Sequence, residues 1–230
     1  MALGPSTTRW IAIASLALNV AVAAVWGWRH VRPRDAAPSR EQARAAALHD
    51  LAAPPAHREV VVLGDSLTER AEWWELLDRP VANRGIAGDT VERVRARLDD
   101  VVALDPRTVF VLVGINDLLA GAAPEALAAR HVALVAELRR RLPRARIVVE
   151  SLLPIRDELV AREAALTSAT VRGANALLER GATAAGAEWL DVAAGLADAT
   201  GELDRRYAGD GVHLSAAGYR AWAAILRAHL

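Results

Sequence analysis

From residue 59 onward, short apolar runs alternate with longer amphipathic segments. Five runs are short, rich in β-branched residues and bounded by turn residues, a pattern typical of strands. We expect these strands at Glu59–Leu63, Val81–Arg84, Thr108–Val113, Arg146–Glu150 and Glu188–Val192. Helices are expected at Glu69–Leu77, Pro124–Arg141, Glu158–Ala185 and Ser215–His229. A further helix is expected to start at a capping box formed by Asp89 and Glu92. This alternation predicts βαβ units and a parallel sheet.

A different pattern occupies the front of the sequence. Residues 10–28 contain no charge, and at about 1.5 Å per residue they are long enough to cross a hydrocarbon core of roughly 30 Å. Trp10, Trp26 and Trp28 lie at the two ends, where interfacial tryptophans are typical. We expect a transmembrane anchor, or uncleaved signal sequence, after a short tail of residues 1–9. The alternative is a signal peptide cleaved near Ala21-Val22-Ala23.

Residues 29–58 are interpreted as a linker rich in Pro, Arg and Ala, and residues 59–230 as one domain. Ser39 and Gln42 resemble a capping box, so a short helix is expected inside the linker. His49 and His57 also lie in this segment, and we interpret them as solvated histidines.

Composition narrows the possible functions. The 28 basic and 28 acidic residues give zero formal net charge, which argues against a nucleic-acid partner because such a partner needs a basic face. The sequence has no cysteine, which excludes disulfides, thiol catalysis and cysteine-ligated metals. It also contains no lysine, so a catalytic base has to be sought among the histidines.

Ser66 is the candidate nucleophile. It lies in Gly64-Asp65-Ser66-Leu67, a small polar turn directly after the first predicted strand. A serine there is catalytic only if a base reaches it, and serines in such turns are commonly helix caps. The neighbouring Asp65 is interpreted as structural, with its carboxylate bonded to loop amides.

His213 is the candidate base among six histidines. It lies in a glycine-punctuated loop that opens the last predicted helix, and Asp210 precedes it by three residues. That spacing allows the Asp210 carboxylate to turn back onto one ring nitrogen and fix the tautomer. His131 lies in the middle of a predicted helix and is interpreted as an ordinary helix-face histidine.

Two further turns offer donors for a developing oxyanion. Gly88 ends the loop after the second predicted strand, and Asn116 follows the third. The Gly88 backbone amide, next to a helix start, and the Asn116 side-chain NH₂ group are both suitable donors. The alternative interpretation is that Gly88 is an ordinary loop glycine and Asn116 an ordinary turn-forming asparagine. Leu118 and Leu152 are candidate substrate-binding residues, with core packing as the alternative. Trp73-Trp74 could cover an acyl or sugar group or belong to the core.

These positions converge on one edge of the predicted sheet. Ser66, Gly88 and Asn116 follow three successive strands, and Asp210 and His213 share the last loop. In an open parallel sheet the carboxyl ends of the strands meet at one edge, which is where active sites form.

Four blocks, in order, resemble the SGNH hydrolases, also called the GDSL esterase/lipase family. The resemblance covers about residues 59–229 and is strongest for the branch related to platelet-activating-factor acetylhydrolases. The blocks are Gly64–Leu67, Asn83–Thr90, Gly114–Asp117 and Asp210–Leu214. The resemblance implies a three-layer α/β/α, flavodoxin-like fold with a five-stranded parallel sheet, catalysis by Ser66, Asp210 and His213, and no metal or cofactor. The implied oxyanion hole consists of Ser66, Gly88 and Asn116.

The expected function is that of a serine esterase working through an acyl-enzyme on Ser66. Candidate substrates are short-chain acyl esters, O-acetyl esters and lysophospholipids. A membrane-tethered binding module without activity and an acyltransferase with an alcohol acceptor remain as alternatives. Oligomeric state is left open.

The side of the membrane is also left open. Four arginines follow the predicted span, namely Arg29, Arg32, Arg34 and Arg40, whereas Arg9 and the amino terminus precede it. By the positive-inside rule this favours a cytoplasmic domain. An N-terminal anchor ahead of a hydrolase usually serves export, which favours an extracytoplasmic domain. We expect the catalytic domain outside the cytoplasm, attached to the membrane through residues 10–28.

Overall fold

Five parallel strands form the centre of the computed structural model, which describes residues 39–52, 59–160 and 166–230. Along the sheet the order is β2-β1-β3-β4-β5. The strands are β1 Val60–Gly64, β2 Val81–Gly85, β3 Thr108–Leu112, β4 Arg146–Glu150 and β5 Glu188–Leu190. The predicted parallel sheet is confirmed, and each predicted strand lies within two residues of its observed bounds.

The register aligns the carboxyl ends of the central strands. Gly64 at the end of β1 lies opposite Gly85 of β2 and Leu112 of β3. Val61, Val62 and Leu63 are fully buried, because both faces of the sheet are covered by helices. The turns that follow β1, β2 and β3 therefore leave the sheet side by side.

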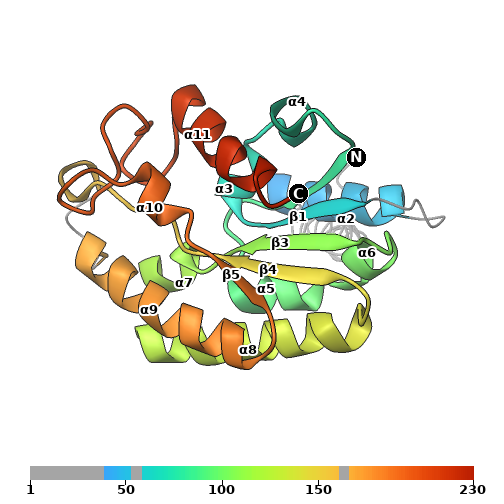
Figure 1. The fold of residues 1–230 in the computed structure, drawn as a ribbon. Coiled ribbons are helices and arrows are strands. Elements are labelled where there is room, and N and C mark those ends of the chain that lie inside the picture. Colours follow the sequence, from blue (N-terminus) through green and yellow to red (C-terminus); the bar gives the residue numbers. More distant parts are fainter. Residues whose placement is uncertain (1–38, 53–58, 161–165) are drawn as a thin grey trace, which may run out of the picture. The chain divides into compact units, whose positions relative to one another are not determined.

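Helices cover the sheet on both faces, as Figure 1 shows. One face carries α3 Ser66–Glu69, α4 Trp73–Leu77 and α11 Ala216–Arg227, and the other carries α5 Val91–Ala96, α8 Pro124–Arg141 and α9 Ser168–Ala184. The remaining short elements are α6 Asp99–Val102, α7 Ile115–Leu119, η1 Asp157–Leu159 and α10 Ala193–Leu196. The predicted three-layer α/β/α fold is confirmed.

Two predicted helices have different bounds. The prediction of one helix over Glu69–Leu77 is wrong, because the Asn83 side chain donates to the carbonyls of Thr68, Glu69 and Ala71 and caps the end of α3. The prediction of a helix from Glu158 is also wrong. Thr167 caps α9 by accepting a hydrogen bond from the Thr170 amide, so this helix begins at Ser168.

The start of α5 also differs from the prediction. Thr90, and not Asp89, is the N-cap, since its hydroxyl accepts from the Arg93 amide. Asp89 instead forms an ion pair with Arg97, with 2.7 Å between Oδ2 and Nε. The carboxylate is drawn toward the largely buried Arg97 guanidinium rather than to the open end of the helix.

The helix expected in the linker is α2 Arg40–Ala52. It contacts α6, where the His49 ring lies 2.8 Å from the Asp100 carboxylate, and its Leu48 side chain is buried. This helix belongs to the same compact unit as residues 59–230, and His49 has a partner although its side chain is largely exposed.

The expected membrane anchor at residues 10–28 lies outside the described residues. Within the part of the chain that the structure describes, no helix has the length and apolar character needed to cross a bilayer.

Candidate active site

Ser66 occupies the first position of α3, directly after the turn that ends β1. Asp65 is the N-cap residue and accepts a 3.0 Å hydrogen bond from the Leu67 amide, which orients the turn. A Cβ on Gly64 would overlap the Leu112 carbonyl and the Thr68 side chain, so only glycine fits where the chain leaves the sheet. The tight strand–turn–helix connection thus presents Ser66 at the carboxyl edge of the sheet.

The structure brings Ser66, His213 and Asp210 together. Ser66 Oγ lies 3.0 Å from His213 Nε2, and His213 Nδ1 lies 2.9 Å from Asp210 Oδ2. The His213 amide also donates to Asp210 Oδ1 over 2.8 Å. With Nδ1–H donating to the carboxylate, Nε2 is free to accept the Ser66 proton.

Asp210 is held in its ionised form. Partial burial opposes ionisation, but the hydrogen bonds from the amide and ring of His213 and from the Val212 amide outweigh it and lower the pKa of Asp210. A carboxylate that stays ionised can stabilise the imidazolium formed when His213 accepts a proton.

Backbone contacts from other loops fix the His213 loop. Gly211 has a φ of 79°, and a Cβ there would meet Leu159. The Gly211 carbonyl accepts a 2.8 Å hydrogen bond from the Arg156 amide. Further along, Tyr219 of α11 donates from its hydroxyl to the Leu67 carbonyl over 3.0 Å. The segments that carry His213 and Ser66 are therefore joined by the Tyr219–Leu67 hydrogen bond in addition to the contact between the two side chains.

Asn116 lies in the first turn of α7, directly after β3. One hydrogen of its side-chain amide binds the Asp89 carbonyl over 2.9 Å. Since an amide nitrogen carries two hydrogens, the other can serve a bound oxyanion. The hydrogen bond to Asp89 also fixes the orientation of the side chain.

Gly88 precedes Asp89 in the loop between β2 and α5. Its φ of 77° lies in the left-handed region that favours glycine. Among the residues that the structure describes, the Gly88 amide has no hydrogen-bond partner. It can therefore donate to a ligand, as the sequence predicts.

Two residues beyond the predicted site residues hold this loop. Asp117 accepts from the Val91 amide over 3.0 Å and forms a 2.7 Å ion pair with Arg130. Arg97 pairs with Asp89 and also donates to the carbonyls of Gly64 and Arg84 at the ends of β1 and β2. Asp117 lies in the Gly114–Asp117 block, which was a usable signal, whereas nothing local distinguishes Arg97 from its neighbouring arginines.

Several residues near the site are core residues. Leu118 and Leu152, the candidate substrate-binding residues, are 4% and 1% exposed. Trp73 is buried and meets Trp222 edge to face, with ring centroids 4.7 Å apart, so it does not cover a ligand; Trp74 is largely exposed. These observations agree with the core-packing alternative for Leu118, Leu152 and Trp73.

His131, interpreted from the sequence as an ordinary helix-face histidine, lies on the buried face of α8. Its Nε2 lies 2.8 Å from the Val113 carbonyl, and burial lowers the pKa of the ring. A neutral His131 donates to the backbone just before the turn that carries Asn116.

Asp65 is the buried carboxyl closest in sequence to the nucleophile. Burial raises its pKa to about 7 despite the hydrogen bond from the Leu67 amide. The Asp65 contacts agree with the structural role expected from the sequence.

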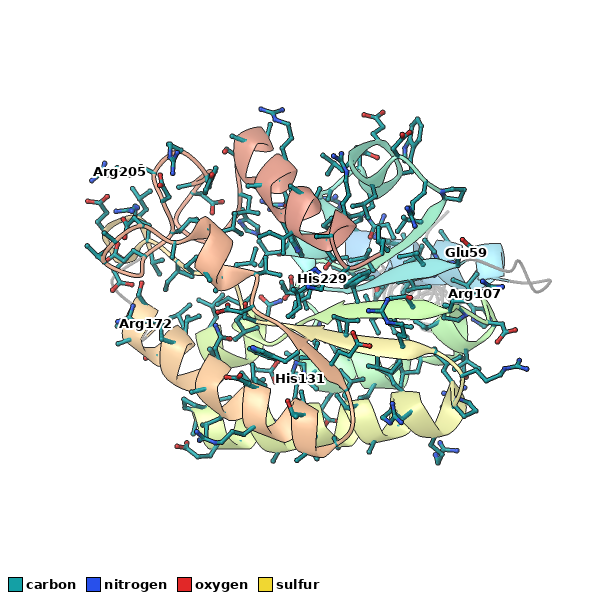
Figure 2. All side chains as sticks on the ribbon, viewed as in Figure 1. Glu59, Arg107, His131, Arg172, Arg205 and His229 are labelled. Carbon is teal, nitrogen blue, oxygen red and sulfur yellow. The ribbon has the colours of Figure 1, made fainter. Side chains whose placement is uncertain are left out.

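A cavity lies beyond the carboxyl ends of β4 and β5, on the side of the sheet where Ser66 also lies. It has a volume of about 280 Å³ and is lined by α9, α10 and adjacent loops, including Pro154, Val171 and Ala194. None of the predicted site residues lines it. Figure 2 shows Arg172 and Arg205 at this end of the molecule, opposite Glu59 and Arg107 at the amino ends of the strands. Within the described residues, no cluster of three or more His, Asp or Glu side chains is suited to hold a metal ion.

A Ser–His–Asp arrangement at the carboxyl edge of a parallel sheet is typical of α/β hydrolases. The chain belongs to the GDSL-like lipase/acylhydrolase family, whose sequence model matches residues 62–221. The family is one of carboxylic ester hydrolases, as expected from the four sequence blocks.

Individual relatives agree with this assignment. A platelet-activating factor acetylhydrolase IB subunit alpha1 from Bos taurus is 37% identical over 103 residues, covering 42% of this chain and 44% of the relative. The chain thus matches less than half the length of that curated relative. The Rattus norvegicus protein of the same name is 31% identical over 170 residues, or 70% of each chain.

A solved structure shares the fold. It is a Streptococcus pneumonia protein provisionally described as a platelet activating factor, with a TM-score of 0.75 and 24% identity. The similarity covers 93% of this chain and 98% of that one.

Proposed function

We propose that the protein is a serine esterase that cleaves carboxylic esters through an acyl-enzyme on Ser66. The observation that carries the proposal is the continuous hydrogen-bonded series from Ser66 Oγ to His213 and from His213 to Asp210. Such a series activates a serine that would otherwise be a weak nucleophile.

In the first half-reaction, His213 Nε2 takes the Ser66 proton while Oγ forms a bond to the ester carbonyl carbon. The carbonyl oxygen becomes an oxyanion, which the amides of Ser66 and Gly88 and the side chain of Asn116 stabilise. His213 then gives its proton to the departing alkoxide as the carbon–oxygen bond breaks. An alcohol leaves, and the acyl group remains on Ser66.

In the second half-reaction, water replaces the alcohol. His213 removes a proton from water as its oxygen attacks the acyl carbon, and the same donors stabilise the second oxyanion. The Ser66 oxygen leaves and recovers a proton from His213, while the carboxylic acid is released. The described residues supply every proton acceptor and donor that these steps need.

We propose short acyl esters, above all acetyl esters, as the substrate class. The curated relatives named above are acetylhydrolases, and Leu118 and Leu152, the residues considered for binding an acyl chain, are packed into the core. O-acetylated glycans and lysophospholipids remain candidate natural substrates within the wider ester class.

Hydrolysis of a small activated acetyl ester tests the proposal. Ser66→Ala should abolish turnover, and Asn116→Ala should lower kcat by roughly 10²–10³-fold because one oxyanion donor is lost. Arg107→Met, at the amino ends of the strands, serves as a control that should retain wild-type turnover. Full activity in a folded Ser66→Ala protein would contradict the mechanism.

Two other functions predict different results. A pure binding module should neither hydrolyse an ester nor react with a serine-directed fluorophosphonate. An acyltransferase should form the acyl-enzyme but deliver the acyl group to an added alcohol faster than to water. Product analysis with a competing alcohol therefore separates hydrolysis from transfer.

The location of the enzyme is part of the proposal. The uncharged segment at residues 10–28 supports a membrane anchor, and we propose that the catalytic domain lies outside the cytoplasm. Protease digestion of intact cells tests this, because an external domain is cleaved without lysis. Protection until the cells are broken would place the domain inside.

A further inference from the structure

Helix α2 lies outside the segment that the family model matches, yet it contacts the turn that leads to Gly88. Arg44 Nε donates to the Gly85 carbonyl over 2.6 Å. The same guanidinium reaches Asn83 Oδ1 at 3.5 Å and Glu69 Oε2 at 3.7 Å. Gly85 is the last residue of β2, so Arg44 binds the chain where the loop that carries Gly88 begins.

Glu69 extends this contact to the nucleophile. It is the last residue of α3, the helix that begins with Ser66, and its side chain is only 5% exposed. Its Oε2 accepts a 2.5 Å hydrogen bond from the amide of Ala87, the residue before Gly88. Its Oε1 accepts a 2.8 Å hydrogen bond from Arg40.

A carboxylate this well shielded from water is costly unless a cation accompanies it. Both ion pairs that Glu69 forms within the described residues come from α2, through Arg40 and Arg44. Removal of α2 would leave the negative charge of the Glu69 carboxylate without these two positively charged partners. Without these two cations the Glu69 carboxylate would be drawn toward solvent, which would weaken its hydrogen bond to the Ala87 amide.

We propose that α2 is a positioning element for the oxyanion hole and that Arg44 is its main positioning residue. Arg44 acts through Gly85 and Glu69 on the loop that carries the Gly88 amide, without touching substrate. The inference rests on the proposed esterase function. It also makes the segment before the hydrolase core, which the sequence suggests is only a linker, a contributor to catalysis.

The test compares variants of the full-length chain on a small activated acetyl ester. Arg44→Met keeps the apolar stem and loses the guanidinium. We expect kcat to fall about 10- to 100-fold, since a misplacement of about 1 Å can cost that much, while KM changes little. Arg146→Met is the matched control, because Arg146 forms a comparable ion pair with Glu188 at the amino ends of the strands. It should retain wild-type kcat.

A rescue experiment separates positioning from a general loss of structure. In Arg44→Ala, millimolar guanidinium should restore part of kcat by occupying the vacated site, whereas methylammonium should not. The proposal is overturned if folded Arg44→Met keeps kcat within about twofold of wild type. If Arg44→Met does not fold, kcat of Arg44→Lys is compared with wild type instead. The lysine retains the positive charge but not the geometry of the guanidinium.

The outcomes distinguish the two proposals. Wild-type hydrolysis that is unaffected by the Arg44 substitutions would refute the role of α2 and leave the esterase function standing. A wild-type protein that neither hydrolyses esters nor reacts with a fluorophosphonate would refute the function itself.

Discussion

At the scale of single residues, Arg97 joins the loop after β2 to the carboxyl ends of β1 and β2. Its guanidinium binds the Asp89 carboxylate and the carbonyls of Gly64 and Arg84, and the Asp89 carbonyl in turn orients Asn116. The ends of two strands and one oxyanion donor thus depend on one largely buried cation. Only the planar, forked geometry of arginine can satisfy these acceptors together.

Arg97→Lys should therefore impair catalysis even though it conserves the charge. We expect kcat to fall about tenfold and the free energy of unfolding to decrease by about 2 kcal/mol, the scale of a lost charge-assisted hydrogen bond. Steady-state kinetics and urea unfolding measure the two effects. Arg95→Lys is the control, since Arg95 pairs with Glu92 and Glu137 nearer the surface. Equal losses in both variants would contradict a special role for Arg97.

Glu150 is a buried carboxyl at the end of β4 that the proposed mechanism does not use. Burial raises its pKa to about 8, and Oε2 accepts a 2.5 Å hydrogen bond from the Trp222 indole. Between an ordinary carboxyl pKa and about 8, the folded protein thus holds a proton that the unfolded chain releases. Folding stability should fall as pH rises through this window.

Glu150→Gln should reduce this pH dependence, because a glutamine keeps an acceptor for Trp222 and has no proton to lose. Urea unfolding at pH 5 and pH 8 checks the expectation. The difference in unfolding free energy between the two pH values should be smaller in the variant than in wild type. An unchanged difference would show that Glu150 is already ionised in the folded state.

At the scale of elements, the helix breaks depend on partners that are distant in sequence. The strands could be predicted because each is a short apolar run, and the start of α11 could be predicted because its cap, Ser215, lies next to it. The predicted start of α9 is wrong although its cap, Thr167, is local. The end of α3 could not be predicted, since its cap is the Asn83 amide from β2. Periodicity detects which face of a segment is buried but not a cap supplied by another strand.

The attachment of α2 to α6 should depend on pH. The hydrogen bond and charge of Asp100 raise the pKa of His49 above its ordinary value of 6.5. The extra stabilisation is complete below that ordinary value and is lost as pH rises through the raised one. NMR titration of the His49 ring should show the raised pKa, and Asp100→Asn should return it toward 6.5. A titration unaffected by Asp100→Asn would contradict the contact.

At the scale of the whole molecule, the sequence points to the proposed catalytic side chains more readily than to the residues that support them. Ser66, Asn116 and His213 could be found because each follows a strand or opens a helix, where active-site residues collect. Arg44 and Arg97 could not, since the sequence contains many arginines and only the folded chain shows which carbonyls they reach. Residues that orient a site can be identified only from their contacts in the folded chain, whereas residues proposed to react can be identified in the sequence from their chemical type and their position.

The Ser66–His213 hydrogen bond joins residues 147 positions apart in the chain. Contacts of such long sequence separation cost the most chain entropy and are among the last to form during folding. Recovery of esterase activity after dilution from urea should therefore follow, and never precede, recovery of the helical signal measured by circular dichroism. Esterase activity is thus a measure of complete folding, because a partly folded chain in which Ser66 lacks its contact with His213 would not hydrolyse esters.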